Sequence, residues 1–380
     1  ERVAHAFLKA GERNHAYVFL KMITPSRLSR DELLIALGRL FDEHKLRDQA
    51  TGCYKEYLAR AARTDHKQAK LQSFASKMLA ESRYQLAINA YEILADRKPR
   101  ASSTLEGLAR AHLGAGQLLK ARGVFERHLS EQSGSKLMAS LNQAADVYLE
   151  FGFTKEAARF LEEKLARERD RWQAPSYSRL CGLYREHGDT ESIIRISKVF
   201  MSRGFNRGRA AEIVSRELER AGLTSDALKL LQSVLKDGGR RLRNRRVLIR
   251  RAIHYASILE DSKAILKYAR AYAKTRGNQA AAWIEAAGFI YEQHHPMLAV
   301  RLIDEGMERW PNHSELQVLR GNYLLGVGRK DAAERDFSDA LAKSASVAAT
   351  MKEIRRLLGT STHQALLARM EKLARAFQPG

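Results

Sequence analysis

One residue pattern recurs along the chain with a period close to 34 residues, and a repeat of this length restricts the possible folds more than any other feature. Each unit has an anchor residue, mostly alanine, with a large residue four positions later and another nine positions earlier. Successive anchors are 34 to 37 residues apart. The ten anchors are Ala16, Ala50, Ala87, Ala121, Ala157, Ile193, Ala227, Ala264, Ala299 and Ala333.

The spacing inside each unit predicts two short amphipathic helices. Positions three and four apart lie on the same face of an α-helix, so each helix carries one apolar stripe. Glycine tolerates the left-handed backbone that ends many helices, and it stands five residues before six of the anchors. One helical pair cannot bury its stripe alone, but stacked pairs can, so the sequence predicts a solenoid. The six turn glycines are Gly11, Gly116, Gly152, Gly188, Gly222 and Gly328.

This pattern resembles the tetratricopeptide repeat (TPR), a family of helical hairpins with a 34-residue period. In the unit that fits best, Trp283, Ala287, Ala299 and Pro311 stand where the family has large, small, small and helix-ending residues. The resemblance covers residues 1–345. It implies an all-α, right-handed TPR superhelical solenoid of about ten helix-turn-helix repeats.

The two ends of the array lead to different expectations. Gly11 and Ala16 already belong to the turn and the second helix of the first unit, so we expect a truncated first repeat in a fragment of a longer chain. Residues 346–380 fall out of register. We expect two helices there, 347–359 and 363–377, which either cap the array or form a degenerate repeat.

Local departures from the pattern predict irregular packing. Ser197 stands where a large residue is expected, and His112 stands where an aromatic residue is expected, so these units are expected to be looser or bent. Gaps of 37 residues before two of the anchors predict longer loops near 64–67 and 236–244.

The sequence contains no set of residues at a spacing that supports catalysis. Ser133-Gly-Ser-Lys136 and Gly326-Val-Gly328 match parts of catalytic or nucleotide-binding motifs, but both lie at turns of the repeat pattern. His294 and His295 have no third metal ligand in view, which favours a capped turn over a metal site. The two cysteines exclude a disulfide framework and are expected to be buried. We therefore predict a protein that is not an enzyme and has no catalytic residue, cofactor or metal.

Charge is the second strong feature, because 66 Lys and Arg against 44 Asp and Glu leave a net charge of +22. Such an excess predicts attraction to acidic surfaces or polyanions. It is densest between residues 238 and 259, where seven arginines occur without an acid. In the TPR family, exposed positions of each first helix line a concave groove that binds the ligand. We transfer these groove positions to this chain by repeat register and add the arginines of the 238–259 cluster. The resemblance then implies partner-binding roles for Arg185, Arg209, Arg216, Arg220, Arg240, Arg241, Arg243, Arg246 and Arg250.

Several partners fit a basic groove. A protein with an acidic surface or an acidic peptide is the first, since guanidinium groups clamp carboxylates with two hydrogen bonds. A solvated charged face without a ligand is the alternative. The asparagine pair of TPR domains that grip acidic chaperone tails is absent, which argues against that subtype. Nucleic acid is disfavoured, because exposed aromatic candidates for base stacking (Trp172, Tyr177 and Phe205) are few and do not recur with the period.

The sequence leaves two cellular compartments open, the periplasm and the cytoplasm. Long Ala-, Leu- and Arg-rich arrays are similar in style to the periplasmic TPR arms of bacterial outer-membrane proteins that export exopolysaccharide. That resemblance implies a periplasmic scaffold that docks a polymer-modifying enzyme, with polysaccharide as a further candidate ligand. A cytoplasmic assembly scaffold is the alternative. No apolar run reaches the 18 or so residues that would span a bilayer.

Overall fold

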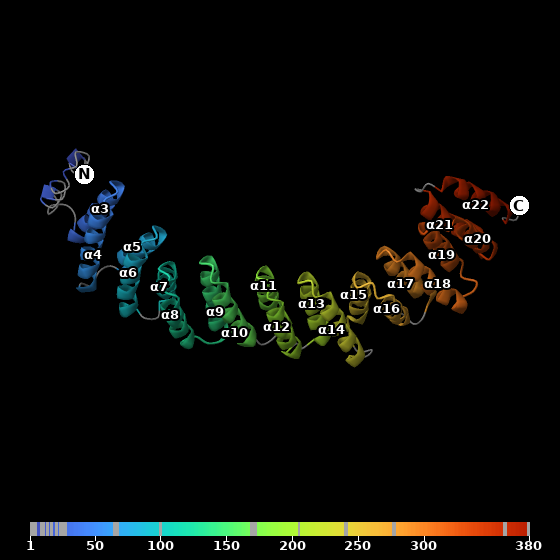
Figure 1. The fold of residues 1–380 in the computed structure, drawn as a ribbon, viewed down its shortest axis with the longest axis horizontal. Coiled ribbons are helices and arrows are strands. Elements are labelled where there is room, and N and C mark those ends of the chain that lie inside the picture. Colours follow the sequence, from blue (N-terminus) through green and yellow to red (C-terminus); the bar gives the residue numbers. More distant parts are fainter. Residues whose placement is uncertain are drawn as a thin grey trace. The chain divides into compact units, whose positions relative to one another are not determined.

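A computed structural model of the chain contains only helices as regular secondary structure in the residues that it describes (Figure 1). The predicted all-α array of TPR-like helix-turn-helix repeats is confirmed. The chain divides into two compact units, Glu1–Glu168 (unit 1) and Arg169–Gly380 (unit 2). The described residues are 29–63, 68–98, 101–167, 173–203, 206–238, 242–275, 279–359 and 363–377, preceded by Ala6, Phe7, Glu12, His15, Val18, Phe19 and Met22.

Each hairpin consists of an odd-numbered first helix and an even-numbered second helix, and consecutive helices pack against each other within the hairpin. From residue 29 on, unit 1 holds the hairpins α3 (Arg30–Glu43) with α4 (Arg47–Arg63), α5 (Gln68–Ala80) with α6 (Tyr84–Arg97), α7 (Ser102–Gly114) with α8 (Leu118–Ser130), and α9 (Gly134–Glu150) with α10 (Thr154–Arg167).

Unit 2 has the same hairpin arrangement, with a longer connection between α14 and α15, where the sequence predicted one. The other predicted loop, 64–67, lies outside the described residues. Its hairpins are α11 (Gln173–Glu186) with α12 (Thr190–Arg203), α13 (Arg207–Arg220) with α14 (Thr224–Asp237), α15 (Arg245–Ile258) with α16 (Ser262–Lys274), α17 (Ala280–Glu292) with α18 (Pro296–Arg309), α19 (Ser314–Gly326) with α20 (Lys330–Ala342), and α21 (Val347–Leu358) with α22 (Gln364–Ala376).

The turn inside the repeat hairpins is one recurring hydrogen-bonded motif. A backbone N–H donates to the carbonyl five residues earlier, as from Leu46 to Phe41 and from Gln117 to His112, both at 2.8 Å. The residue before the donor has a positive φ, which is the Schellman ending of a helix. Five predicted turn glycines adopt this conformation, and Gly11 lies outside the described residues. The five are Gly116, Gly152, Gly188, Gly222 and Gly328, with φ between 67° and 78°.

The turn between α15 and α16 shows that one anchor was wrong by a single position. Here the N–H of Asp261 donates to the carbonyl of Ala256 at 2.9 Å, and Glu260 has a φ of 54°. The anchor that is equivalent by turn geometry is therefore Ile265, which is fully buried, rather than Ala264, which is 7% exposed. The prediction failed because the anchor of this unit was assigned from its small side chain and not from its distance to the turn.

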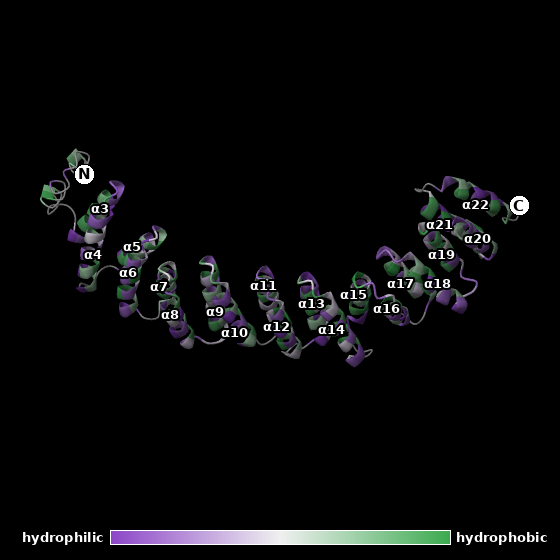
Figure 2. Ribbon diagram, in the orientation of Figure 1, coloured by the Kyte–Doolittle hydropathy of each residue, from purple (hydrophilic) through white to green (hydrophobic). Residues whose placement is uncertain are grey.

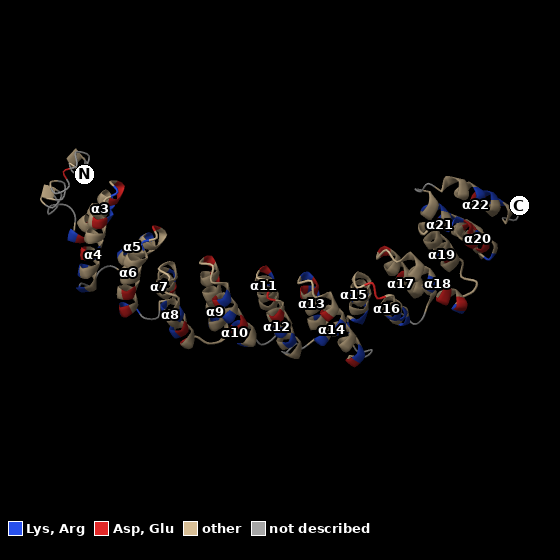
Figure 3. Ribbon diagram, in the orientation of Figure 1, with Lys and Arg blue, Asp and Glu red and all other residues tan. Residues whose placement is uncertain are grey.

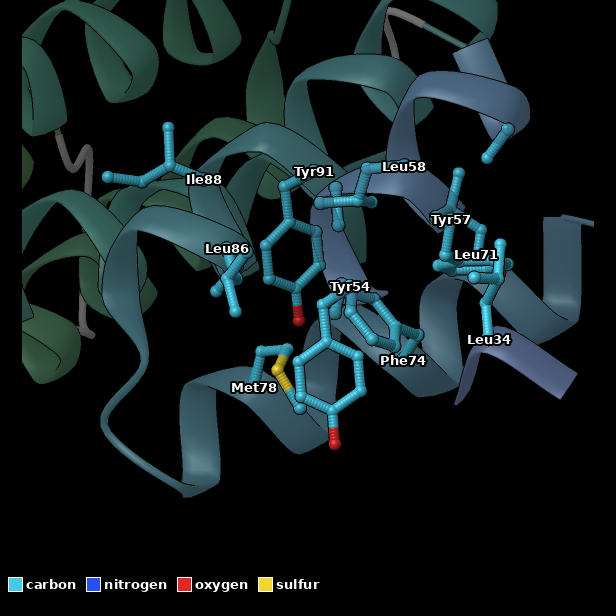
Figure 4. Packing of buried hydrophobic residues seen from close by; sticks show 14 of the residues in the cluster. Leu34, Tyr54, Tyr57, Leu58, Leu71, Phe74, Met78, Leu86, Ile88 and Tyr91 are labelled. Atoms are coloured by element: carbon cyan, nitrogen blue, oxygen red, sulfur yellow. The ribbon is translucent and has the colours of Figure 1, made fainter. Parts of the chain in front are cut away.

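The core consists of small anchors with large side chains packed around them. Ala50 and Ala87 are completely buried, and such a small residue lets the helices of a hairpin cross closely. In unit 1 the ring centroids of Tyr54 and Phe74 lie 5.5 Å apart, and both rings are packed with Met78 (Figure 4). Hydrophobic and hydrophilic residues are interleaved along the helices, so each helix keeps a polar side (Figure 2).

Ser197 does not loosen its hairpin, because Tyr177 occupies the space that a larger residue would fill. The hydroxyls of Tyr177 and Ser197 lie 2.7 Å apart, and the Tyr177 ring stacks on Phe200 with centroids 4.4 Å apart. Tyr177 is fully buried, and burial raises its pKa. The prediction that Tyr177 is an exposed aromatic residue is therefore wrong. Trp172 and Phe205, its companions in that prediction, lie outside the described residues.

The other predicted irregularity is also a packed site. His112 is 3% exposed, and its Nδ1 lies 3.0 Å from Oε1 of Gln117. Burial lowers the pKa of His112, which favours the neutral ring. A histidine with one hydrogen-bond partner thus replaces the expected aromatic residue without exposing the core.

The last two helices lie close to where the sequence placed them. Helix α21 contacts α19 and α20, and α22 contacts α20, with Arg369 paired to Glu334 at 3.1 Å. Their role as a cap or a degenerate repeat stays a prediction. Across the described residues, no helix combines the length and the apolar character that crossing a membrane would require.

Candidate functional site

Three of the predicted partner-binding arginines pair with glutamates of their own chain. Arg185 and Arg220 both approach Glu217, at 3.6 Å and 2.9 Å, and the Glu217 side chain is only 4% exposed. Arg216 lies 3.4 Å from Glu212 on the same helix. Together the two arginines compensate the buried carboxylate of Glu217. Because Arg185 lies on α11 and Glu217 on α13, this pair also holds the two helices together.

Four other predicted arginines form a group that we call the arginine face. Arg209 lies on α13, Arg243 two residues before α15, and Arg246 and Arg250 on α15, and all four are exposed. Among the described residues, none of the four has a carboxylate within 4 Å. Arg240 and Arg241, the remaining predicted residues, lie outside the described part of the chain.

The pairing elsewhere in unit 2 makes the arginine face stand out. Arg270 binds Glu305 through two hydrogen bonds of 2.7 Å and 2.6 Å. Arg320 donates to both Asp304 and Asp336, at 2.6 Å and 2.7 Å. Basic and acidic residues are interleaved along many helices (Figure 3), yet the arginine face lacks this compensation. Its charge is therefore available to a partner.

A cleft of about 340 Å³ opens between α15 and α17 beside this charge. The Arg250 guanidinium lies 3.9 Å from the centroid of the Phe289 ring, a cation–π contact that fixes its position. Val247, 42% exposed, and Ile253 also line the cleft. A partner side chain can thus bury apolar surface on Phe289 and Val247 while it faces a guanidinium.

A hydrogen-bond network ties the helices of the cleft together. His254 lies between Glu219 of α13, with Nε2 3.0 Å from Oε1, and Gln293, with Nδ1 2.7 Å from Oε1. Tyr255 donates to the other oxygen of Glu219 at 3.1 Å. Arg251 donates to the Tyr255 hydroxyl at 3.3 Å, while its buried Nε has no partner among the described residues. The network positions α13, α15 and the end of α17 with side chains from each.

The charge of the arginine face is also felt at a neighbouring tyrosine. The pKa of Tyr272 is raised by burial and then by its hydrogen bond to Glu285, which measures 2.7 Å. Arg246 and Arg250 act in the opposite direction and lower it. Both arginines therefore lie close enough to Tyr272 on α16 to influence its charge state, although among the described residues neither forms an ion pair.

Sequence reasoning found the arginines but missed the cleft beside them. Phe289, His254 and Gln293 were not singled out, because none falls at a core position of the repeat and none is part of a charge cluster. Phe289 follows Gly288 on α17 and precedes the core residue Ile290, so the off-register aromatic was the available signal.

Motifs that suggested other chemistry are structural in this fold. His295 caps α18 directly before Pro296, and His294 is the left-handed turn residue with a φ of 65°. Across the described residues, no three His, Cys, Asp or Glu side chains gather as metal ligands would. Cys53 and Cys181 are buried free thiols, and burial raises the pKa of Cys53 to about 11 and of Cys181 to about 12.

Solved structures similar to this chain include two complexes. One is Naa15/Naa10 bound to HypK-THB, 13% identical with a TM-score of 0.35, where the match covers 97% of this chain and 61% of that chain. The other is the TPR2AB domain of yeast Sti1 with pHSP90, 12% identical with a TM-score of 0.28, covering 80% of this chain and 98% of that chain. This chain thus spans about three fifths of the Naa15/Naa10 chain that it matches. No family model and no curated protein matches the sequence.

Proposed function

We propose that this chain is a non-catalytic scaffold that binds an acidic protein surface or peptide through the arginine face of α13 and α15. The single observation that supports this most is the exposure of Arg209, Arg243, Arg246 and Arg250 without a carboxylate partner among the described residues. Unpaired surface charge of one sign attracts and orients a partner of the opposite sign.

The arginine face and the α15–α17 cleft would contribute differently to binding. Exposed arginines mainly raise the association rate and exclude partners of the wrong charge. Affinity comes mostly from a few side chains that become fully desolvated. The surface of Phe289 and Val247 is the apolar part of this site, and Arg250 lies directly over the Phe289 ring. The partner segment that fits is therefore acidic with at least one apolar side chain.

A nucleic-acid partner is the alternative that the charge permits. Single-strand binders usually offer aromatic rings on which bases stack. Among the described residues Phe377, 42% exposed, is the most exposed Phe, Tyr or Trp side chain, and it lies at the end of α22, away from the arginine face in the sequence. This favours protein over nucleic acid.

The narrower setting rests on sequence style alone. A periplasmic part of an exopolysaccharide-export system that docks a polymer-modifying enzyme, with polysaccharide as a further ligand, stays a prediction. A cytoplasmic assembly scaffold is equally compatible with the arginine face. The coarse role, a repeat array that binds protein, does not depend on the compartment.

The proposed function is tested with a charge reversal at the arginine face. We expect a partner captured by the purified chain to be lost from the Arg246→Glu, Arg250→Glu variant, because two attractive charges become repulsive. The control is Arg127→Glu, Arg159→Glu, which changes net charge equally on exposed residues of unit 1. The captured protein is identified by mass spectrometry and its binding remeasured with purified components.

Two results would contradict the proposal. In one, the reversed variant and the control retain the same partner with the same affinity, which removes the arginine face as the site. In the other, the chain retains single-stranded RNA or DNA with a steep dependence on salt concentration, and the same reversal abolishes it.

A further inference from the structure

Unit 1 contains a groove of a different kind between its first helices α3 and α5. It has a volume of about 510 Å³, within the range of ligand-binding pockets. Ile35 and Ala36 of α3 face Ala69, Ser73 and Phe74 of α5 across it. Because Ala36, Ala69 and Ser73 are small, a bound backbone can approach both helices closely. Phe74 and Tyr54 line the groove as well, and both belong to the buried cluster that Figure 4 shows.

The groove continues into a second hollow at the hairpin turns. This hollow has a volume of about 810 Å³, and Arg39 and Lys77 line both spaces. Arg39, Lys45 and Arg47 are exposed in it, and none of them has a carboxylate within 4 Å among the described residues.

Most of the acidic residues that line the hollow are paired with a cation. Asp42 accepts a hydrogen bond from Arg83, and Glu81 lies 3.4 Å from Lys77. Glu43 is exposed and has no cation partner among the described residues, so one unpaired acid stands against three unpaired cations. The combined space thus has apolar lining with one compensated ion pair, Glu32 with Lys70, at one end, and excess positive charge at the other.

The distribution of apolar and charged residues along this space favours a peptide over a nucleic acid. Phe74 is 5% exposed and Tyr54 1% exposed, with their ring centroids 5.5 Å apart, so neither ring offers a free face on which a base could stack. An apolar lining next to unpaired cations complements a segment that carries both apolar side chains and carboxylates.

We propose that the α3–α5 groove is a second docking site, independent of the arginine face, for a linear peptide with apolar side chains at one end and carboxylates at the other. The apolar side chains cover Ile35 and Ala36 and displace water from the space above Phe74. The carboxylates accept hydrogen bonds from Arg39 and Arg47, whose planar guanidinium groups suit bidentate pairing. The site shares no residue with α13, α15 or α17.

Peptide display tests the proposal without knowledge of the natural partner. A library of random 12-residue peptides is selected on the whole chain, and the affinity of the most enriched peptide is measured by fluorescence anisotropy. We expect enriched peptides to combine Leu, Phe or Ile with Asp or Glu. Ala69→Gln with Ser73→Gln adds bulk at exposed helix positions and is expected to weaken binding by about tenfold or more. Arg39→Gln with Arg47→Gln is expected to weaken it by about threefold to tenfold.

Matched variants separate the groove from other sites. Ala62→Gln with Ala139→Gln adds the same bulk at exposed positions outside the groove and is expected to leave affinity unchanged. Arg246→Glu with Arg250→Glu is also expected to leave it unchanged, so this site and the arginine face can fail separately. Circular dichroism of each variant verifies that it is folded.

Three outcomes would overturn the proposal. The selection yields no peptide above the naive library, or it yields peptides without enriched carboxylates. The enriched peptide binds the Ala69→Gln, Ser73→Gln variant as tightly as the unmodified chain. Analytical ultracentrifugation shows that the chain self-associates and that the same variant is monomeric, in which case a second copy occupies the groove.

Discussion

The α3–α5 groove and the α15–α17 cleft are built from equivalent helices of the repeat, yet they offer a partner different surfaces. Facing positions in the groove are occupied by Ala36 and Ala69, which leaves about 510 Å³ of open space. In the cleft, Arg250 is stacked on Phe289, and about 340 Å³ remains. The repeat therefore fixes the backbone, while side-chain size at a few exposed positions decides whether a surface is a groove or a charged face.

The largest effect is expected from removing the side chain that fills the cleft. Phe289→Ala should destabilise unit 2 by about 2 kcal/mol, because it deletes a half-buried ring and its cation–π contact with Arg250. The measurement is the shift in the urea midpoint. Leu119→Ala, at a residue 81% exposed, is the control and should change the midpoint very little. Equal shifts for both variants would mean that Phe289 does not support the cleft.

Salt should distinguish the two surfaces next. Screening weakens interactions between exposed charges, so an acidic partner of the arginine face should lose about tenfold in affinity between about 0.05 M and 0.5 M salt. A peptide in the α3–α5 groove should lose only about threefold, because salt screens its carboxylate contacts with Arg39 and Arg47 but not its apolar burial. Titrations of each complex at several salt concentrations provide the measurement. A steeper loss for the groove peptide would reverse the assignment of the two surfaces.

A third, smaller effect on stability is expected from substitutions in the hairpin turns of both units. Ser82 in unit 1 and Glu260 in unit 2 hold φ values of 57° and 54°. Lys45 and His294 are likewise non-glycine residues at positive φ, while five other described turns have glycine. The left-handed conformation is unfavourable for residues with a Cβ, so Ser82→Gly and Glu260→Gly should each stabilise the chain by about 0.5–1 kcal/mol. Thermal unfolding measures the gain. As the converse, Gly116→Ala at a φ of 73° should destabilise by a similar amount, and stabilisation by that variant would refute the argument.

The fold was predictable from sequence because it depends on local, repeated constraints. Turn glycines and anchors such as Ala50 specify hairpins residue by residue. Within the described residues the structure agrees with them, except that Ala264 set the register of its unit wrong by one position. The surfaces were less predictable, since they depend on which charges meet in space. Arg185 and Arg246 are equally basic in the sequence, but only Arg185 faces a buried glutamate, Glu217, from the next hairpin. Equivalent reasoning missed Tyr177, whose burial follows from the small side chain of Ser197 twenty residues later.

The smallest expected effect is a pH-dependent change in stability that comes from Glu32, a residue that lines the α3–α5 groove. Glu32 on α3 accepts a hydrogen bond from Lys70 on α5 at 2.6 Å and another from the backbone of Ser29 in a capping box. These bonds, that of Lys70 first, lower the pKa of Glu32 to about 2 from its ordinary 4.5. A carboxyl with a lowered pKa contributes stability that is complete above pH 4.5 and is lost as the pH falls toward 2.

The stability difference between the unmodified chain and Glu32→Gln should therefore shrink between pH 5 and pH 2, measured by urea unfolding at each pH. Among the described residues the arginine face has no equivalent carboxylate contact, so the stability difference between the unmodified chain and Arg246→Gln should not change over this interval. If the Glu32→Gln difference is constant with pH, the bond to Lys70 does not link α3 to α5, and the groove is held open by packing alone.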